Sequence, residues 1–273
     1  MEQISYDPRE SRLHFLDRNK YVVSIEKSRY KELPANDRKL ASEKIDENNR
    51  MPMKCHVMAH HEEGIRQACA LPYELYADGM TTQDGAHWEL RLTAGNQVHG
   101  IASAGVPFNV YMRGRDVDQG LQVATFAVKA DDTIVRKFPI DVFNGEENSI
   151  EVHGPNGFYR SFSGRIVSQS AVNVYATYER NASGLTGNLQ IHLDNISRKS
   201  VVAMIADQVY GATEIRKQLD PGEAAELVLP PHSSSGWYDV LVTVESSVAS
   251  VRYAGHVDTG SPGISDPLMG GLS

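Results

Sequence analysis

Residues 88–92 read Trp-Glu-Leu-Arg-Leu, with an apolar side chain at every second position and a charged side chain between. This alternation has the period of a β-strand that buries one face and exposes the other to water. Short runs of the same kind, separated by Gly, Asn and Asp, follow along residues 71–256. Such runs are typical of antiparallel strands joined by tight turns, which we expect at Asn144–Gly145 and at residues 155–157. The sequence therefore predicts an all-β fold after Leu71.

The alternating runs form two sets of similar length. The apolar positions of residues 88–92 have counterparts at Leu189, Ile191 and Leu193, which lie 101 residues further along the chain. Both sets also end with an aromatic residue two positions before a glycine, at Gly164 and at Gly255. A repeat of this length is the size of a domain rather than of a solenoid unit. We therefore predict a tandem duplication of one antiparallel β-sandwich.

The N-terminal part of the chain lacks this alternation of apolar and polar residues. Residues 21–49 are charged and tolerate a helix, with a break at Pro34 and a weak helix start at Ser42, whereas residues 51–70 have no sustained period and predict an extended linker. The predicted domains are a short mixed helical and extended segment at residues 1–66, a first β-sandwich at 67–167, and a second β-sandwich with a C-terminal tail at 168–273.

Composition excludes several classes of function. The 273 residues carry 27 Lys and Arg against 35 Asp and Glu, so the basic stripe that binds nucleic acid is missing. No apolar run approaches the roughly 20 residues that span a bilayer. The first residues contain no continuous apolar stretch, so we expect no export signal in the chain as written. Cys55 and Cys69 are too few for a disulfide framework, and their pairing stays open.

Motifs for common chemistry are absent from the sequence. Neither of the glycine-rich phosphate loops occurs, and neither does the GxSxG motif that presents a nucleophilic serine. The residue types that bind metal gather only in the linker, at Cys55, His56, His60, His61, Glu62 and Glu63. This run does not form HExxH and lies in a segment without helical period. We therefore interpret it as a solvated linker and predict no catalytic residue, no metal ligand and no cofactor.

Aromatic and cationic side chains supply candidates for binding. Trp88 and Trp237 lie at strand positions, where a core role is more common than a stacking platform for a ligand. Arg160 and Arg252 lie near the ends of the two sets and are expected to pair with carboxylates inside the sandwich or at its junction. The candidates for binding or for a domain interface are Arg66, Tyr73, Trp88, Trp237, Tyr238 and His256.

Several phrases of the sequence carry a resemblance to a known family. They are the residues CALPYEL at 69–75, HGPNGF at 153–158, GWYDV at 236–240 and AGHVDTG at 254–260, followed by SDP at 265–267. Together they resemble the C-terminal part of the bacterial phosphocholine-preferring phospholipases C, in which two copies of a small β domain follow a large catalytic domain. The resemblance extends to residues 11–15 and 30–34, which look like the last stretch before the two copies.

This resemblance implies a function for the complete enzyme and a different role for this chain. The complete enzyme would hydrolyse phosphatidylcholine or sphingomyelin and release phosphocholine, in an extracellular or periplasmic location. The nucleophile and metal ligands of the family's catalytic domain have no counterpart here, so residues 1–66 would be the tail of that domain with its linker. The chain is then an accessory region that braces or orients the catalytic domain, which is its expected partner.

Membrane contact and two rival functions stay open. Residues 71–273 hold 14 Lys and Arg against 23 Asp and Glu, which disfavours anionic lipid and leaves a zwitterionic phospholipid surface as a second partner. The first rival is a binding module in which one sandwich holds a choline head group by cation–π contact, or a sugar by stacking. The second is a metal-dependent hydrolase that uses the linker histidines His56, His60 and His61.

Overall fold

The computed structural model describes residues 35–50, 64–82, 84–113, 121–139, 149–164, 171–231, 233–245, 247 and 249–269. The chain divides into two compact units, residues 1–60 and residues 61–273. The first unit contains the helix α2, Ala35–Arg50, whose described side chains are exposed. The helix falls within the segment predicted to tolerate one and begins directly after Pro34 in the sequence. The expected helix start at Ser42 was wrong.

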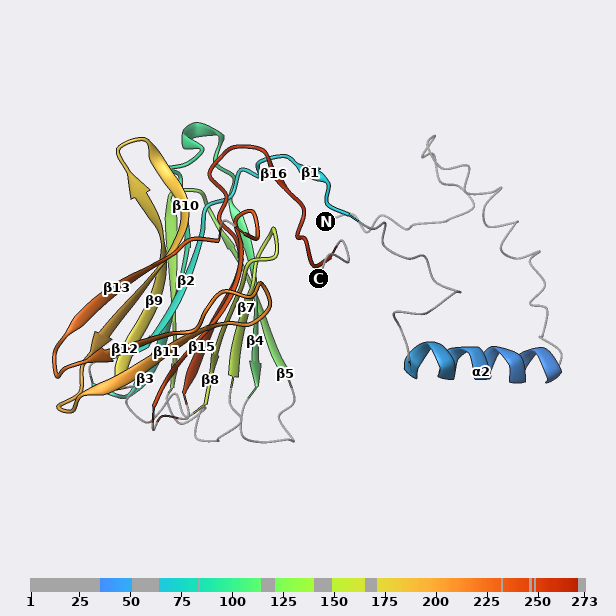
Figure 1. Cartoon of the computed structure of the whole chain (residues 1–273), viewed down its shortest axis with the longest axis horizontal. Coiled ribbons are helices and arrows are strands. Elements are labelled where there is room, and N and C mark those ends of the chain that lie inside the picture. Colours follow the sequence, from blue (N-terminus) through green and yellow to red (C-terminus); the bar gives the residue numbers. More distant parts are fainter. Residues whose placement is uncertain are drawn as a thin grey trace, which may run out of the picture. The chain divides into compact units, whose positions relative to one another are not determined.

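The second unit is an antiparallel β structure in two layers (Figure 1). One layer is an eight-stranded sheet. Its strands, in order across the sheet, are β12 (Ile215–Leu219), β11 (Val201–Asp207), β14 (Trp237–Val244), β15 (Ser250–His256), β8 (Tyr159–Ser163), β7 (Ser149–His153), β4 (Val106–Arg113) and β5 (Leu121–Val128). This topology confirms the predicted all-β fold.

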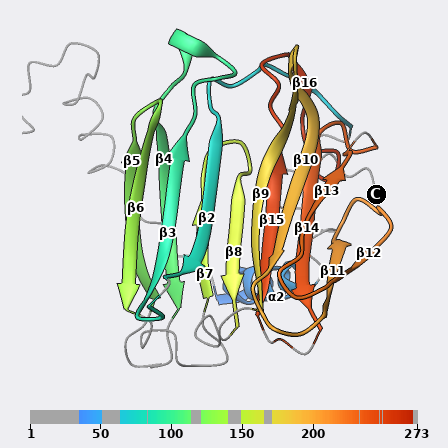
Figure 2. The same cartoon turned by 90° about the vertical axis from the view of Figure 1, so that its left-hand side faces the viewer.

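The other layer consists of two three-stranded sheets, which Figure 2 shows beside each other. The first contains β2 (Leu75–Thr81), β3 (His87–Ala94) and β6 (Asp132–Pro139), and the second contains β9 (Val172–Asn181), β10 (Gly184–Asn195) and β13 (Ala224–Leu229). The edge strands β2 and β9 face each other without a ladder of backbone hydrogen bonds between them. A short 3₁₀ helix, η2 (Gly100–Ala102), connects β3 to β4.

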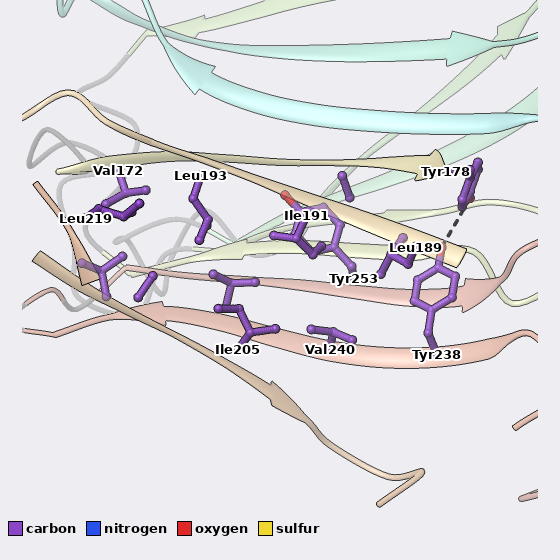
Figure 3. Packing of buried hydrophobic residues seen from close by; sticks show 14 of the residues in the cluster. Val172, Tyr178, Leu189, Ile191, Leu193, Ile205, Leu219, Tyr238, Val240 and Tyr253 are labelled. Carbon is purple, nitrogen blue, oxygen red and sulfur yellow. Dashed lines mark hydrogen bonds between the residues drawn. The ribbon is translucent and has the colours of Figure 1, made fainter. Parts of the chain in front are cut away.

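Alternation of apolar residues explains the two cores. Within β3, Trp88, Leu90 and Leu92 are buried while Arg91 between them is exposed, as the pattern predicts. The first core lies between β2–β3–β6 and one half of the eight-stranded sheet, and the second lies between β9–β10–β13 and the other half. Figure 3 shows the second core, in which Leu189, Ile191 and Leu193 of β10 lie among the side chains of the opposite sheet.

Turn residues fix the hairpin between β7 and β8. Asn156 and Gly157 both adopt positive φ, at 56° and 70°, which is the conformation that a tight hairpin turn requires. The backbone N–H of Gly154 donates to the carbonyl of Phe158 at 2.9 Å and closes the hairpin. The turn expected at residues 155–157 is therefore confirmed. The turn expected at Asn144 and Gly145 lies outside the described residues.

The two sandwiches share one sheet. β8, from the first half, pairs antiparallel with β15, from the second, with Ser161 opposite Arg252. The ladder of the eight-stranded sheet is therefore continuous across the junction, and residues 61–273 form a single compact unit. The boundaries 67–167 and 168–273 stay a prediction about domains, because this geometry does not separate the halves into independent bodies.

Candidate functional site

The segment that enters the first sandwich is hydrogen bonded to the tail that leaves the second. β1 (Gln67–Ala68) pairs with β16 (Gly263–Ile264), and the two strands lie side by side in Figure 1. Next to them, the N–H of Ser265 donates to the carbonyl of Arg66 at 2.8 Å, and the N–H of Arg66 donates to Oγ of Ser265 at 3.0 Å. We call β1, β16 and the contacts of residues 64–71 with residues 257–269 the terminal clamp.

Two aromatic side chains fasten the tail to the second sandwich. Nε1 of Trp237 donates a hydrogen bond of 3.0 Å to the carbonyl of Ile264. The hydroxyl of Tyr210 donates to Oδ1 of Asp266 at 3.1 Å. Because both bonds reach residues near the strand β16, the clamp is held by the second sandwich as well as by the entry segment.

His256 lies beneath the clamp. Its ring packs against Trp237 with the ring centroids 4.9 Å apart, and its Nε2 lies 3.2 Å from the carbonyl oxygen of Ser235. Burial lowers the pKa of His256, and its Nδ1 is buried without a hydrogen-bond partner among the described residues. His256 is therefore a neutral packing group near neutral pH.

A further contact of the clamp lies nearby. Oδ2 of Asp258 accepts a hydrogen bond of 3.0 Å from the backbone N–H of Leu71.

The predicted site residues fall into two groups. Arg66, Trp237 and His256 belong to the clamp or its support, and Tyr73 lines with His256 a hollow of about 10 Å³, room for one water molecule. The other two candidates lie in cores. Trp88 is 3% exposed and packs on Phe162, with the ring centroids 5.2 Å apart, and Tyr238 is 5% exposed in the second core.

A buried arginine joins the two sandwiches. Arg160 is 2% exposed, and its Nη1 donates to the carbonyls of Tyr159 at 2.8 Å and of Ala254 at 2.9 Å. Its Nη2 donates to the hydroxyl of Tyr238 at 2.9 Å. The guanidinium also lies 4.0 Å from the ring centroid of Phe158, within the range of a cation–π contact. Because these partners come from both halves, Arg160 holds the halves together.

The two arginines singled out in the sequence differ in their partners. Arg252 donates to Asp239 through Nε at 2.7 Å and through Nη2 at 2.5 Å, so its expected pairing with a carboxylate is confirmed. The hydrogen bonds described for Arg160 go to two carbonyl oxygens and a hydroxyl instead. Side chains two residues apart in a strand point to the same face. Arg160 therefore points into the interior on the same face of β8 as the buried Phe162.

Glu74 forms a second polar link that the sequence analysis missed. The side chain is 4% exposed, and its Oε2 accepts the backbone N–H groups of Gln97 at 2.8 Å and Val98 at 3.0 Å. Its Oε1 accepts the hydroxyl of Tyr76 at 2.7 Å and forms an ion pair with Arg180 of β9. This ion pair connects the two three-stranded sheets. The sequence held no signal for it, because charged residues are usually exposed.

Asp78 gives the junction a pH dependence. Burial raises the pKa of Asp78 to about 6, while the nearby charge of Arg160 and a 3.5 Å bond from the N–H of Ala176 oppose the rise. The unfolded chain loses this proton near its ordinary pKa of 3.8, so between about pH 4 and 6 the folded state holds a proton that the unfolded state has lost. Stability should therefore fall as the pH rises through this window, by at most about 3 kcal/mol.

Urea unfolding at a series of pH values tests this expectation. Asp78→Asn keeps an acceptor for Ala176 and removes the titration, so the variant should lose less stability between pH 4 and 6 than the wild type. The difference in unfolding free energy between the two proteins removes the contribution of the carboxylates that titrate elsewhere in the chain. An unchanged pH slope in the variant would show that Asp78 titrates normally.

The structure places no metal centre in its described part. Among the described residues, no group of three or more His, Cys, Asp and Glu side chains is arranged to hold a metal ion. The linker residues from Cys55 to Glu63 lie outside these residues, so their role stays a prediction. Cys69 is an exposed free thiol. None of the described helices is long and apolar enough to cross a membrane.

The sequence also matches known proteins. The family model described as "Bacterial phospholipase C, C-terminal domain" matches residues 67–165 and again residues 172–256. The haemolytic phospholipase C of Pseudomonas aeruginosa is 33% identical over 239 residues, which cover 76% of this chain and 30% of that protein. The non-haemolytic phospholipase C of the same organism is 34% identical, with coverage of 78% and 30%.

A third relative shows the same proportions. The non-haemolytic phospholipase C of Burkholderia pseudomallei is 26% identical over 232 residues, covering 80% of this chain and 30% of that protein. The chain thus spans about 30% of the length of these relatives. The two matches of the family model coincide with the two sandwiches that β8 and β15 join. This chain therefore belongs to the family of bacterial phospholipase C C-terminal domains.

Proposed function

We propose that this chain is the C-terminal accessory region of a phospholipase C that hydrolyses phosphatidylcholine or sphingomyelin to release phosphocholine. In this role it is non-catalytic, acts in an extracellular or periplasmic location, and braces the catalytic domain that precedes it. The match to the phospholipase C C-terminal domain supports the accessory role, and the terminal clamp supports bracing. Contact with a zwitterionic phospholipid surface stays a prediction.

The clamp fixes the point at which a preceding domain would be attached. The entry segment continues covalently into β2 of the first sandwich. Pairing of β1 with β16 and the two bonds between Arg66 and Ser265 add an attachment to the second sandwich. A segment held at both places has less freedom to swing than a single-chain linker. The entry point is thus rigid relative to both sandwiches.

Enzyme assay of the purified 273-residue chain tests the non-catalytic role. We expect no release of phosphocholine from phosphatidylcholine, with or without added divalent metal. The matched control is the triple variant in which His56, His60 and His61 are replaced by Ala. Turnover by the wild type well above that of the triple variant would contradict the accessory role and favour a metal-dependent hydrolase in the linker.

We expect a substitution in the clamp to loosen the entry segment. Ser265→Pro removes the N–H that bonds Arg66 and the hydroxyl that accepts from it, two hydrogen bonds worth about 1 kcal/mol each. Hydrogen exchange of the backbone amides of Arg66 and Ala68 should accelerate by roughly tenfold to thirtyfold. Ser265→Thr retains both groups and serves as the control.

Bracing is then measured in a phospholipase C that carries this region behind its catalytic domain. Ser265→Pro should shorten the half-life of activity on heating while leaving the KM unchanged, because a bracing role involves no contact with substrate. Ser265→Thr should behave as the parent enzyme. Equal half-lives for the Pro and Thr variants, together with faster exchange in the Pro variant, would mean that the clamp forms but braces nothing.

A further inference from the structure

A groove of about 310 Å³ opens at the edge of the second sandwich. Its apolar walls include Ile205, Ile215, Leu229 and Val240. Strand β13 ends at Leu229, and two prolines follow it. Proline has no backbone N–H to donate to a sheet, so the strand pairing stops there and leaves the groove open. A concave, mostly apolar hollow of this volume lies at the lower end of the range for small-molecule sites.

Two aromatic side chains line this groove and are held in place. Trp237 and Tyr210 both line it, and each uses its polar atom to bond the C-terminal tail, at Ile264 and Asp266 respectively. These bonds leave the rings with fixed positions, so ligand binding would not have to order them. Tyr238, whose hydroxyl faces Arg160, adds a third ring to the lining.

Carboxylates make the groove electronegative. Asp207 and Asp239 line it, and Asp266 is bonded to Tyr210. Arg252 neutralises Asp239. The Asp207 oxygens accept three backbone N–H bonds of 2.9 Å from the following loop, which fix the carboxylate in position without cancelling its charge.

The titration of Tyr210 supports this charge distribution. Burial raises its pKa first, and the carboxylates Asp266, Asp239 and Asp207 raise it further. The carboxylates of Asp266 and Asp207 therefore act at one ring of the groove, whereas Arg252 offsets the charge of Asp239. No Lys or Arg is among the described lining residues.

We propose that this groove binds an organic cation with an apolar body, of the quaternary or arylalkyl ammonium class. Aromatic faces attract such a cation, with about 0.5 to 2 kcal/mol per contact. The carboxylates add Coulomb attraction, and the apolar walls accept the hydrocarbon part. An anion of the same size would meet repulsion from Asp207 and Asp266. The proposal does not depend on the accessory role, because it rests on the second sandwich alone.

The two tryptophans provide a selective readout. Trp237 lines the groove, whereas Trp88 is buried in the first core, so their indole N–H signals in a ¹H–¹⁵N spectrum report separately on the two places. Titration with benzyltrimethylammonium should shift the Trp237 signal in a saturable manner and leave the Trp88 signal in place. Trp237→Phe assigns the signal by removing it. Benzyl alcohol should bind at least several-fold more weakly, and benzoate should give no saturable shift.

A charge variant tests the electrostatic part. Oδ1 of Asp266 accepts both of its described bonds, from Tyr210 and from the N–H of Leu268, so Asp266→Asn keeps these acceptors and removes only the charge. We expect the dissociation constant for benzyltrimethylammonium to rise by about threefold to tenfold. Asp220→Asn is the matched control, since Asp220 bonds Ser200 through Oδ1 outside the groove.

The outcomes separate the proposal from its rivals. Equal binding of benzoate and benzyltrimethylammonium, or a shift confined to Trp88, would overturn it. An equal effect of the two Asn variants would also overturn it, because the charge at the groove would then be irrelevant. A titration with dihexanoylphosphatidylcholine below its micelle concentration distinguishes a lipid-borne cation from a free one: a saturable Trp237 shift identifies a lipid head group as a source, and its absence alongside binding of the free cation identifies a soluble ligand.

Discussion

Replacement of Arg160 by Met is expected to lower the free energy of unfolding of the β unit by about 3 to 5 kcal/mol. The change removes the donors to the carbonyls of Tyr159 and Ala254 and to the hydroxyl of Tyr238. It also removes a positive charge that acts on the half-buried carboxylate of Asp78. Leaving buried acceptors without their cationic donor is among the most costly single changes in a protein.

Thermal denaturation followed by circular dichroism measures this effect. For a unit of this size, a loss of that magnitude lowers the melting temperature by roughly 6 to 20 °C. Arg113→Met is the control, because the side chain of Arg113 is 60% exposed and its ion pair with Glu151 spans 3.9 Å. The control should change stability by less than about 1 kcal/mol. If the two variants melted together, Arg160 would have no role in joining the sandwiches.

The second large effect is expected at Gly79 of β2, which lies against Trp88 of the first core. A Cβ atom at this position would lie 1.9 Å from Cζ2 of Trp88, well inside van der Waals contact. Trp88 cannot easily move away, because it is 3% exposed and packs on Phe162 with 5.2 Å between the ring centroids. Gly79→Ala should therefore destabilise the unit by about 2 to 4 kcal/mol through overpacking.

A double-mutant cycle identifies the clash as the cause. Trp88→Leu frees the space above residue 79 and costs stability by itself, because a large buried ring is lost. When combined with Trp88→Leu, Gly79→Ala should cost at least about 1 kcal/mol less than it does alone. Urea unfolding of the four proteins gives the coupling energy. Simple additivity would mean that the contact with Trp88 is not the cause of the destabilisation.

Part of the candidate site could be anticipated from residue types. Trp237 and His256 were selected as aromatic or polar residues at the end of the second set of strands, and both support the clamp. Arg66 was selected as part of the entry segment, and its backbone rather than its charge makes the clamp bonds. Glu74, Asp78 and the groove carboxylates were missed, since no local pattern distinguishes a buried acid from a solvated one.

The sequence by itself determined the strands, because alternation and turn residues act over a few positions. Residues 88–92 became a half-buried strand, and Asn156 with Gly157 became a hairpin turn, through local preferences alone. Tertiary structure alone decided the rest. Pairing of β8 with β15, the burial of Arg160 and the meeting of the entry segment with the tail each join residues 78 or more positions apart. Such contacts depend on which sheet edges meet in the folded unit, and a local period carries no information about that choice.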